Sequence, residues 1–97
     1  MPISRAHVST ASGAKYMTQL CKHWSHRLPV EYNETTGRID FDAERRCVLH
    51  AEPDGLEIEV ETASDEQLTR TQDTVINHLK RFAFREELGA VEWRRLD

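Results

Sequence analysis

The stretch CVLHAEPDGLEIEVE, residues 47–61, decides the fold class. Its centre, Pro53-Asp54-Gly55, is typical of a tight turn. On both sides of this turn every second residue shares one face: Cys47, Leu49 and Ala51, then Leu56, Ile58 and Val60. A period of two is typical of a strand that buries one face. We therefore predict a hairpin of two antiparallel strands with one apolar and one polar face.

Shorter alternating segments extend this hairpin in both directions along the chain. Residues 30–32 and 39–42 alternate in the same way and flank the turn-rich segment 33–37, so they predict a second hairpin. Residues 3–10 predict a strand at the beginning of the chain, and Val91 and Trp93 predict a last strand over residues 91–94.

Two segments show helical periodicity. The first begins at Ser12, a suitable N-cap, runs to about residue 27 and is stopped by Pro29. Its apolar stripe is Tyr16, Met17, Leu20 and Trp24. The second begins with a capping box, in which Ser64 and Gln67 cap each other, and ends before Gly89. Its stripe is Leu68, Val75, Ile76, Leu79, Phe82 and Ala83.

The predicted order is β-α-β-β-β-β-α-β in one domain, residues 1–97. We expect an α+β fold in which an antiparallel sheet of five or six strands carries both helices on one face. This order resembles the TATA-binding-protein-like and helix-grip folds. The likeness concerns the fold alone and implies nothing about DNA binding.

Composition narrows the class of protein. Two cysteines, Cys21 and Cys47, are too few for a disulfide framework, and no apolar run is long enough to be a secretion signal or a membrane span. We therefore expect a cytoplasmic protein that does not enter membranes.

Residues 31–73 carry 13 acidic and 4 basic side chains, whereas residues 1–30 carry 4 basic and no acidic ones. A nucleic-acid-binding protein is not expected from this split.

Two longer motifs carry a family resemblance. They are YMTQLCKHWSH, residues 16–26, and HLKRFAFREE, residues 78–87. With the hairpins between them, they resemble the bacterial family of unknown function DUF2218 over nearly the whole chain. The resemblance implies no established activity. It implies an association of some members with iron uptake, so a siderophore-interacting or iron-uptake protein is an expected partner.

The first candidate site is a metal site formed by Cys21, His23, His26 and His78. At 100° per residue, Cys21 points about 160° away from His23, so the thiol cannot easily join the histidines. The spacing matches no standard metal motif. We therefore assign no metal ligand, name no cofactor, and interpret Cys21 as a residue at the edge of the core.

The second candidate is a basic cleft between the two helices. At helical spacing His78, Arg81 and Arg85 share one flank, and with Lys22, His23 and His26 they suit a carboxylate, a phosphate or a siderophore-like anion. The ligand-binding residues we expect are His23, His26, His78, Arg81 and Arg85. The alternative is that Arg81 and Arg85 only form surface ion pairs, with Glu86, Glu87 or the acidic strands.

Two further features are open to more than one interpretation. Phe84 points away from the helical stripe, so it either packs under the following turn, which we favour, or contacts a partner. Glu31, Asp40, Asp42, Glu57, Glu59 and Glu61 line the polar face of the sheet, where we expect solvated carboxylates.

We expect an accessory or binding module for a small anionic or iron-related ligand. The alternative is a protein-interaction module, either a homodimer or a docking partner. No catalytic motif is present and no catalytic residue is assigned.

Overall fold

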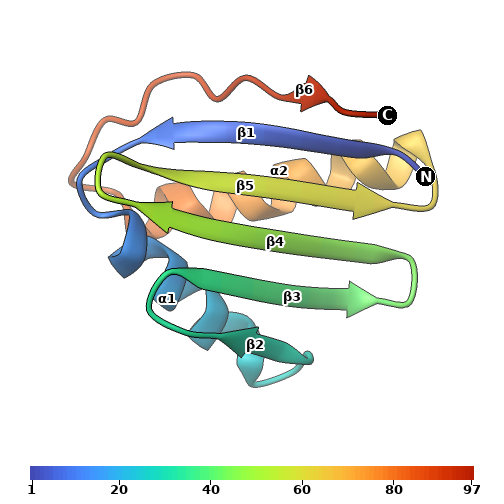
Figure 1. Cartoon of the computed structure of the whole chain (residues 1–97), viewed down its shortest axis with the longest axis horizontal. Helices are drawn as coiled ribbons and strands as arrows, with labels where there is room; N and C mark the ends of the chain where they lie inside the picture. Colours follow the sequence, from blue (N-terminus) through green and yellow to red (C-terminus); the bar gives the residue numbers. More distant parts are fainter.

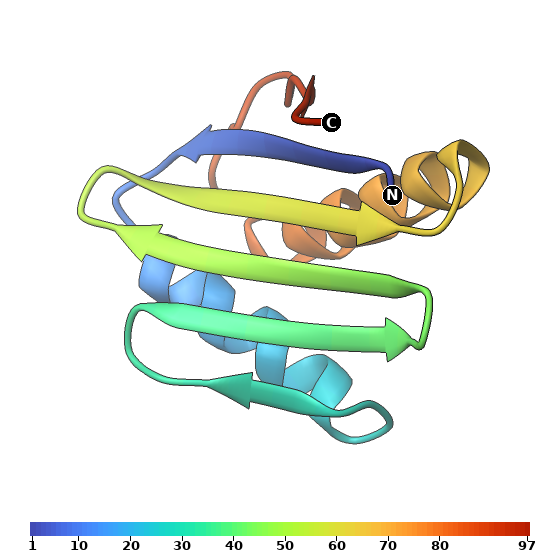
Figure 2. The same ribbon diagram turned by 45° about the vertical axis from the view of Figure 1, so that its right-hand side comes forward.

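One antiparallel sheet and two helices form the protein, and the computed structural model describes all 97 residues. Both helices lie on the same face of the sheet (Figures 1 and 2), which confirms the predicted α+β fold. Across the sheet the strand order is β2-β3-β4-β5-β1-β6, and every neighbouring pair is antiparallel. Along the chain the elements are β1 (Ile3–Ser9), α1 (Gly13–Ser25), β2 (Val30–Tyr32), β3 (Thr36–Asp42), β4 (Arg45–Glu52), β5 (Gly55–Thr62), α2 (Asp65–Phe82) and β6 (Arg94–Arg95).

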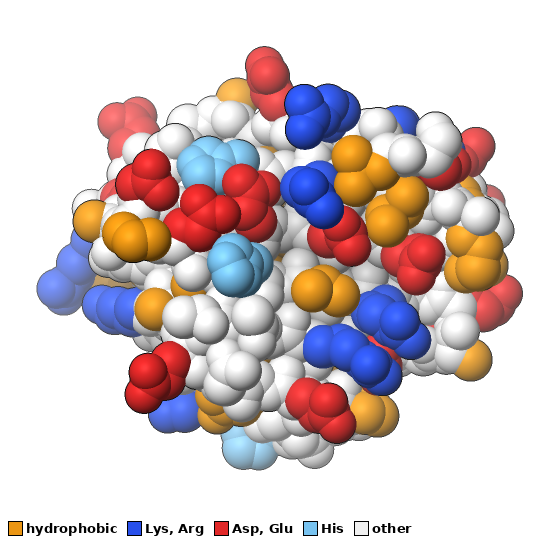
Figure 3. Space-filling model, viewed as in Figure 1, with side chains coloured by type: hydrophobic (Ala, Val, Ile, Leu, Met, Phe, Trp, Pro, Cys, Tyr) orange, Lys and Arg blue, Asp and Glu red, His pale blue; other side chains and the backbone are white.

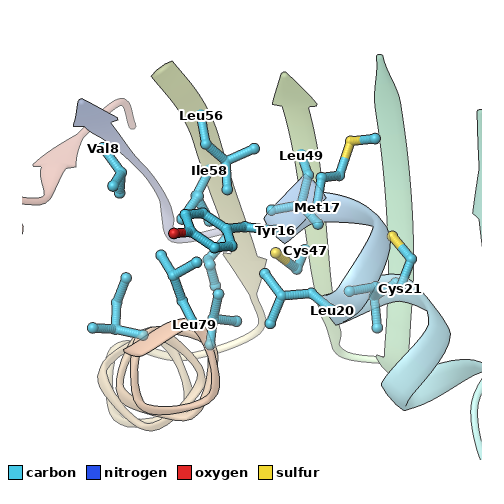
Figure 4. Close-up of a cluster of buried hydrophobic side chains, with 14 of the residues drawn as sticks. Val8, Tyr16, Met17, Leu20, Cys21, Cys47, Leu49, Leu56, Ile58 and Leu79 are labelled. Carbon is cyan, nitrogen blue, oxygen red and sulfur yellow. The ribbon is translucent and has the colours of Figure 1, made fainter. Parts of the chain in front are cut away.

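The hairpin of β4 and β5 is the centre of the sheet and supplies much of the core. Its register places Leu49 opposite Ile58 and Cys47 opposite Val60, so the apolar residues of both strands face the helices together. Figure 4 shows these side chains meeting Met17 and Leu20 of α1. The core cluster contains 18 buried residues from the sheet and both helices. Burial of this common apolar face is what holds the helices on the sheet.

Bare glycine backbone sets how closely α1 approaches the sheet. A Cβ atom on Gly13 would overlap the carbonyl oxygen of Gly55, so the beginning of α1 lies directly on the turn between β4 and β5. On the other side of Gly55, a Cβ atom would overlap the ring of His7. Further along α1, Cys21 packs on Gly37 of β3. A Cβ atom on Gly37 would lie 2.7 Å from the Cys21 sulfur. Alanine at any of these positions would push elements apart.

The two helices begin differently. The Ser64 hydroxyl accepts a hydrogen bond from the Gln67 amide (3.2 Å), as predicted, but the Gln67 side-chain oxygen is buried without a partner, so only half of the capping box forms. Ser12 makes no side-chain cap, which contradicts the prediction. Its own amide instead donates to the Thr10 hydroxyl (3.0 Å), and this bond shapes the turn that leads into α1.

The end of α2 differs from the sequence prediction. The helix ends at Phe82, and the chain then turns so that the Tyr16 hydroxyl donates to the Glu86 carboxylate at 2.6 Å. This bond ties the end of α2 to α1. The turn also leaves Phe84 74% exposed, so the packing that we favoured for this side chain is wrong.

The last strand is shorter than predicted and begins later in the chain. Only Arg94 and Arg95 pair with β1, opposite Arg5 and Ser4, whereas pairing was expected over residues 91–94. Residues 90–93 run beside β1 without pairing to it (Figures 1 and 2). Neither helix of the fold has the length and apolar character that crossing a membrane requires.

Two buried threonines give a test of the core. The Thr62 hydroxyl donates to the Ser64 carbonyl oxygen at 2.7 Å, whereas the Thr71 hydroxyl is buried without a partner. Thr71→Val should raise the free energy of unfolding by about 1 kcal/mol because it removes an unsatisfied polar group. Thr62→Val should lower it by about 1 kcal/mol. Urea denaturation measures both, and destabilisation by Thr71→Val would show that the Thr71 hydroxyl is hydrogen-bonded.

Candidate functional site

Two histidines meet where the helices lie side by side on the sheet. The His23 ring of α1 and the His78 ring of α2 have centroids 5.0 Å apart. Trp24 lies against the His78 ring at 4.7 Å, and Phe82 lies 5.9 Å from the His23 ring. Phe41 of β3 contacts Trp24 at 5.1 Å. Because Trp24 is only 9% exposed, it joins the histidine pair to the core beneath it.

The tautomer of His78 follows from its hydrogen bond. Its Nδ1 lies 2.7 Å from the backbone carbonyl oxygen of Thr74, one turn earlier in α2. A carbonyl oxygen only accepts, so Nδ1 carries the proton and donates it. In the neutral ring Nε2 is then left with a free lone pair. The arrangement holds the ring in one orientation, and Nε2 can accept a hydrogen bond or, when protonated, donate one.

Cations surround the histidine pair without any acidic partner. We define the basic helix face as the following side chains near the C-terminal ends of α1 and α2: Lys22, His23, His26, Arg27, His78 and Arg81. None of them takes part in any of the eight ion pairs of the protein. The predicted alternative, in which Arg81 and Arg85 pair with acidic residues, is therefore not what the structure shows.

The open face of the sheet has the opposite character. Four of the six carboxylates named above are paired, among them Glu59 with Arg5 (2.8 Å) and Asp40 with both Arg38 and Arg46 (3.0 Å each), whereas Glu31 and Glu61 are not. Hydrogen bonds from these arginines hold the pKa of Asp40 below its usual value. Figure 3 shows acidic, basic and histidine side chains mixed over this face. Charges on the sheet therefore largely cancel, while those of the basic helix face do not.

The pKa of His23 records the positive surroundings. It is lowered from 6.5, first by partial burial of the ring and then by the charges of His78, His26, Arg27 and Arg81. Each cause disfavours the protonated ring. The pKa of His23 is therefore lowered, as expected for a partly buried ring among positive charges that no carboxylate neutralises.

Of the five predicted ligand-binding residues, the structure brings His23 and His78 into contact. His26 and Arg81 lie close enough for their charges to act on His23. Arg85 is different: α2 ends before it, so the predicted helical flank does not extend to this residue, and its guanidinium lies over the Phe84 ring at 5.3 Å. A role for any of these residues in binding remains a prediction.

Cysteine and metal chemistry find no support in the geometry. Cys21 is fully buried against Gly37, and burial raises the pKa of its thiol to about 11, so it is a core residue and not a nucleophile. Nowhere in the protein do three His, Cys, Asp or Glu side chains form a group that can hold a metal ion.

Several residues of the site were assigned otherwise from the sequence. Trp24 and Phe82 belong to the apolar stripes, as predicted, but they also form the aromatic floor and wall of the histidine pair. Arg27 was not predicted as a site residue, although its charge acts on His23. The signal in the sequence for Arg27 was the absence of acidic residues from positions 1–30, which leaves the basic residues of that segment without nearby partners along the chain.

The fold and the site define a class: a small α+β protein with an open antiparallel sheet whose helix layer carries an unpaired basic, histidine-bearing face. Residues 5–94 match the family model DUF2218, described as an uncharacterized protein conserved in bacteria, and the chain belongs to this family. The chain is also similar to PA4090 from Pseudomonas aeruginosa, whose structure was determined by NMR. The two are 36% identical, the match covers 97% of this chain and 96% of that one, and the TM-score is 0.82. No curated protein matches the chain.

Titration of His23 tests the field at the site. Its pKa should lie below 6.5 and should rise in His78→Gln, because that variant removes a neighbouring positive charge. Since the unfolded chain binds the proton more tightly, the contribution of His23 to stability is present above pH 6.5 and is lost as the pH falls toward the folded-state pKa. NMR of the imidazole Cε1–H signals measures both pKa values.

The matched control is Arg70→Ala, which removes an ion-paired arginine two to three turns away on the same helix and should leave the His23 midpoint unchanged. A His23 midpoint at or above 6.5 in the native protein would contradict the described surroundings.

Proposed function

We propose that this protein is a non-catalytic binding module that holds a small polyanion on the basic helix face. The observation that carries the proposal is the contrast in charge pairing. Of the ten arginines, six bind carboxylates on the sheet, on α2 or at the C-terminus, whereas Arg27 and Arg81 of the basic helix face, together with Arg85 and Arg94, bind none.

Helix dipoles account for only part of this positive charge. The C-terminus of each helix carries the equivalent of about half a negative charge, which favours cations there. The two ends together offset about one unit. Lys22, Arg27 and Arg81 supply three full positive charges even when every histidine is neutral. A net positive potential is therefore left over, and an anion is the natural counterpart.

The side chains also suit an anion chemically. Arg27 and Arg81 can each donate paired N–H groups to a carboxylate or phosphate. In the protonated form both ring nitrogens of His23 and of His78 are donors, and a bound anion favours that form.

The ligand class is an anion with several carboxylate or phosphate oxygens. Anionic ferric siderophores belong to this class, and the family resemblance is what supports an iron-related ligand and a partner from iron uptake. We also propose a cytoplasmic location, which two free, buried cysteines fit.

Protein docking is the second candidate function, and the exposure of Phe84 favours it. This aromatic ring is 74% exposed and carries Arg85 over its face, a combination common at interfaces. Homodimers formed by joining β2 or β6 of two copies are less favoured, because these strands present only three and two residues. Sedimentation equilibrium with the native chain and Phe84→Ser tests docking between copies; a monomer in both at all concentrations would remove the homodimer.

Titration with citrate tests the principal proposal. Citrate should bind the full chain saturably, and Arg81→Ala should weaken binding about tenfold, because a charge-assisted hydrogen bond contributes about 1.5–3 kcal/mol. Isothermal titration calorimetry at low salt gives the affinities. Binding should weaken as salt is added, because the site is exposed.

Arg70→Ala is the matched control, since Arg70 lies on the same helix but is bound to Glu66 at 2.8 Å. It should bind citrate as the native protein does. Equal losses in Arg70→Ala and Arg81→Ala would show non-specific attraction, and no binding of citrate or pyrophosphate by the native chain would refute the proposal.

A further inference from the structure

The outer edge of β1 is only partly covered. On its inner side β1 pairs with β5 along its whole length, from Ile3 opposite Glu61 to Ser9 opposite Gly55. On its outer side it pairs with β6 only at Ser4 and Arg5. The second half of this edge has no neighbouring strand.

The hydrogen-bonding pattern shows which groups are free. Just beyond the two ends of β1, the Thr10 amide donates to the Asp54 carbonyl oxygen, and the Pro2 carbonyl oxygen accepts from the Thr62 amide. The backbone N–H and C=O groups of even-numbered residues of β1 therefore point toward β5. The backbone N–H and C=O groups of odd-numbered residues point the other way, toward β6. The hydrogen bond from the Leu96 amide to the Ile3 carbonyl oxygen shows this.

The alternation therefore directs the backbone N–H and C=O groups of His7 and Ser9 outward, and neither residue has a backbone partner there. Free groups of this kind on a strand edge are a template for an additional strand.

A groove begins at the His7 end of this free edge. It has a volume of about 650 Å³ and lies between Arg5, His7 and Glu57 on the sheet side and Ala90, Glu92 and Trp93 of the C-terminal segment. Figure 1 shows that segment following β1. The volume lies within the range of about 300–1,000 Å³ that is typical of ligand sites.

We propose that this groove binds an extended peptide segment of a partner protein, which adds to the sheet as a strand through the backbone of His7 and Ser9. Main-chain hydrogen bonds supply the affinity in this mode of recognition. The side chains on the sheet wall are already engaged, since Arg5 binds Glu59 at 2.8 Å and His7 binds Glu57 at 2.7 Å. Recognition therefore falls to the peptide backbone, with Trp93 as an apolar contact. The site is separate from the basic helix face and does not depend on the proposed function.

The protein's own C-terminal segment is the competing occupant. The register of Arg5 opposite Arg94, if continued, would place Glu92 opposite His7 and Ala90 opposite Ser9. Closure of the segment onto β1 would fill the groove and pair the free groups. The structure instead keeps residues 90–93 unpaired.

Hydrogen exchange on the native, full-length chain tests the proposal. The probes are linear dodecapeptides selected from a phage-displayed library and then synthesised. In the free protein the His7 and Ser9 amides should exchange rapidly, and a bound peptide should slow both at least about tenfold. Protection of these amides in the free protein would show that the C-terminal segment closes the edge, which would overturn the proposal. It would also be overturned if no peptide is selected, or if the selected peptides shift only resonances of the basic helix face.

Two substitutions at one position separate backbone from side-chain recognition. Ser9→Pro removes the outward N–H and should weaken peptide binding about fivefold to tenfold, whereas Ser9→Ala keeps the N–H and should bind as the native chain does. Proline is tolerated where a strand N–H faces outward, and circular dichroism checks that the variant folds. Unchanged affinity in a folded Ser9→Pro would contradict the proposal, and if that variant does not fold, the exchange measurement on the native chain decides.

Discussion

The sheet can bury only one of its faces, and the rest of the structure follows from that constraint. Side chains alternate along β4 and β5, so the apolar set faces one way and the charged set the other. Both helices must cover the same apolar face and therefore lie against each other. Gly13 and Gly55 then let α1 approach the sheet at backbone distance. The contact between His23 and His78 is a direct result of this shared face.

The same constraint divides the charges of the protein. On the open face of the sheet, neighbouring strands bring acidic and basic side chains to adjacent positions, where they bind in pairs such as Arg5 with Glu59. Helix ends offer no such acidic neighbours around His23 and Arg81. The basic helix face is therefore left with unpaired cations above a buried aromatic floor, and these cations add to the effect of partial burial in lowering the pKa of His23.

Local patterns in the sequence predict the elements, because strand and helix periods depend on residues close together in the chain. They predict the central hairpin and both helices well, and they place His23 and His78 on facing helices. They fail where distant residues decide. The bond between Tyr16 and Glu86 joins residues 70 positions apart and accompanies the end of α2, which takes Arg85 off the predicted flank. Likewise, the alternation at residues 91–94 predicts a strand, but pairing to β1 begins only at Arg94.

The most direct test of the binding site is the pKa of His23 measured by NMR with and without saturating citrate. In the free protein it should lie below 6.5, because burial and neighbouring cations disfavour the proton. A polyanion on the basic helix face reverses that field, so the pKa should rise when citrate is bound. If citrate saturates the protein and the pKa of His23 does not move, the anion binds elsewhere and the central claim is wrong.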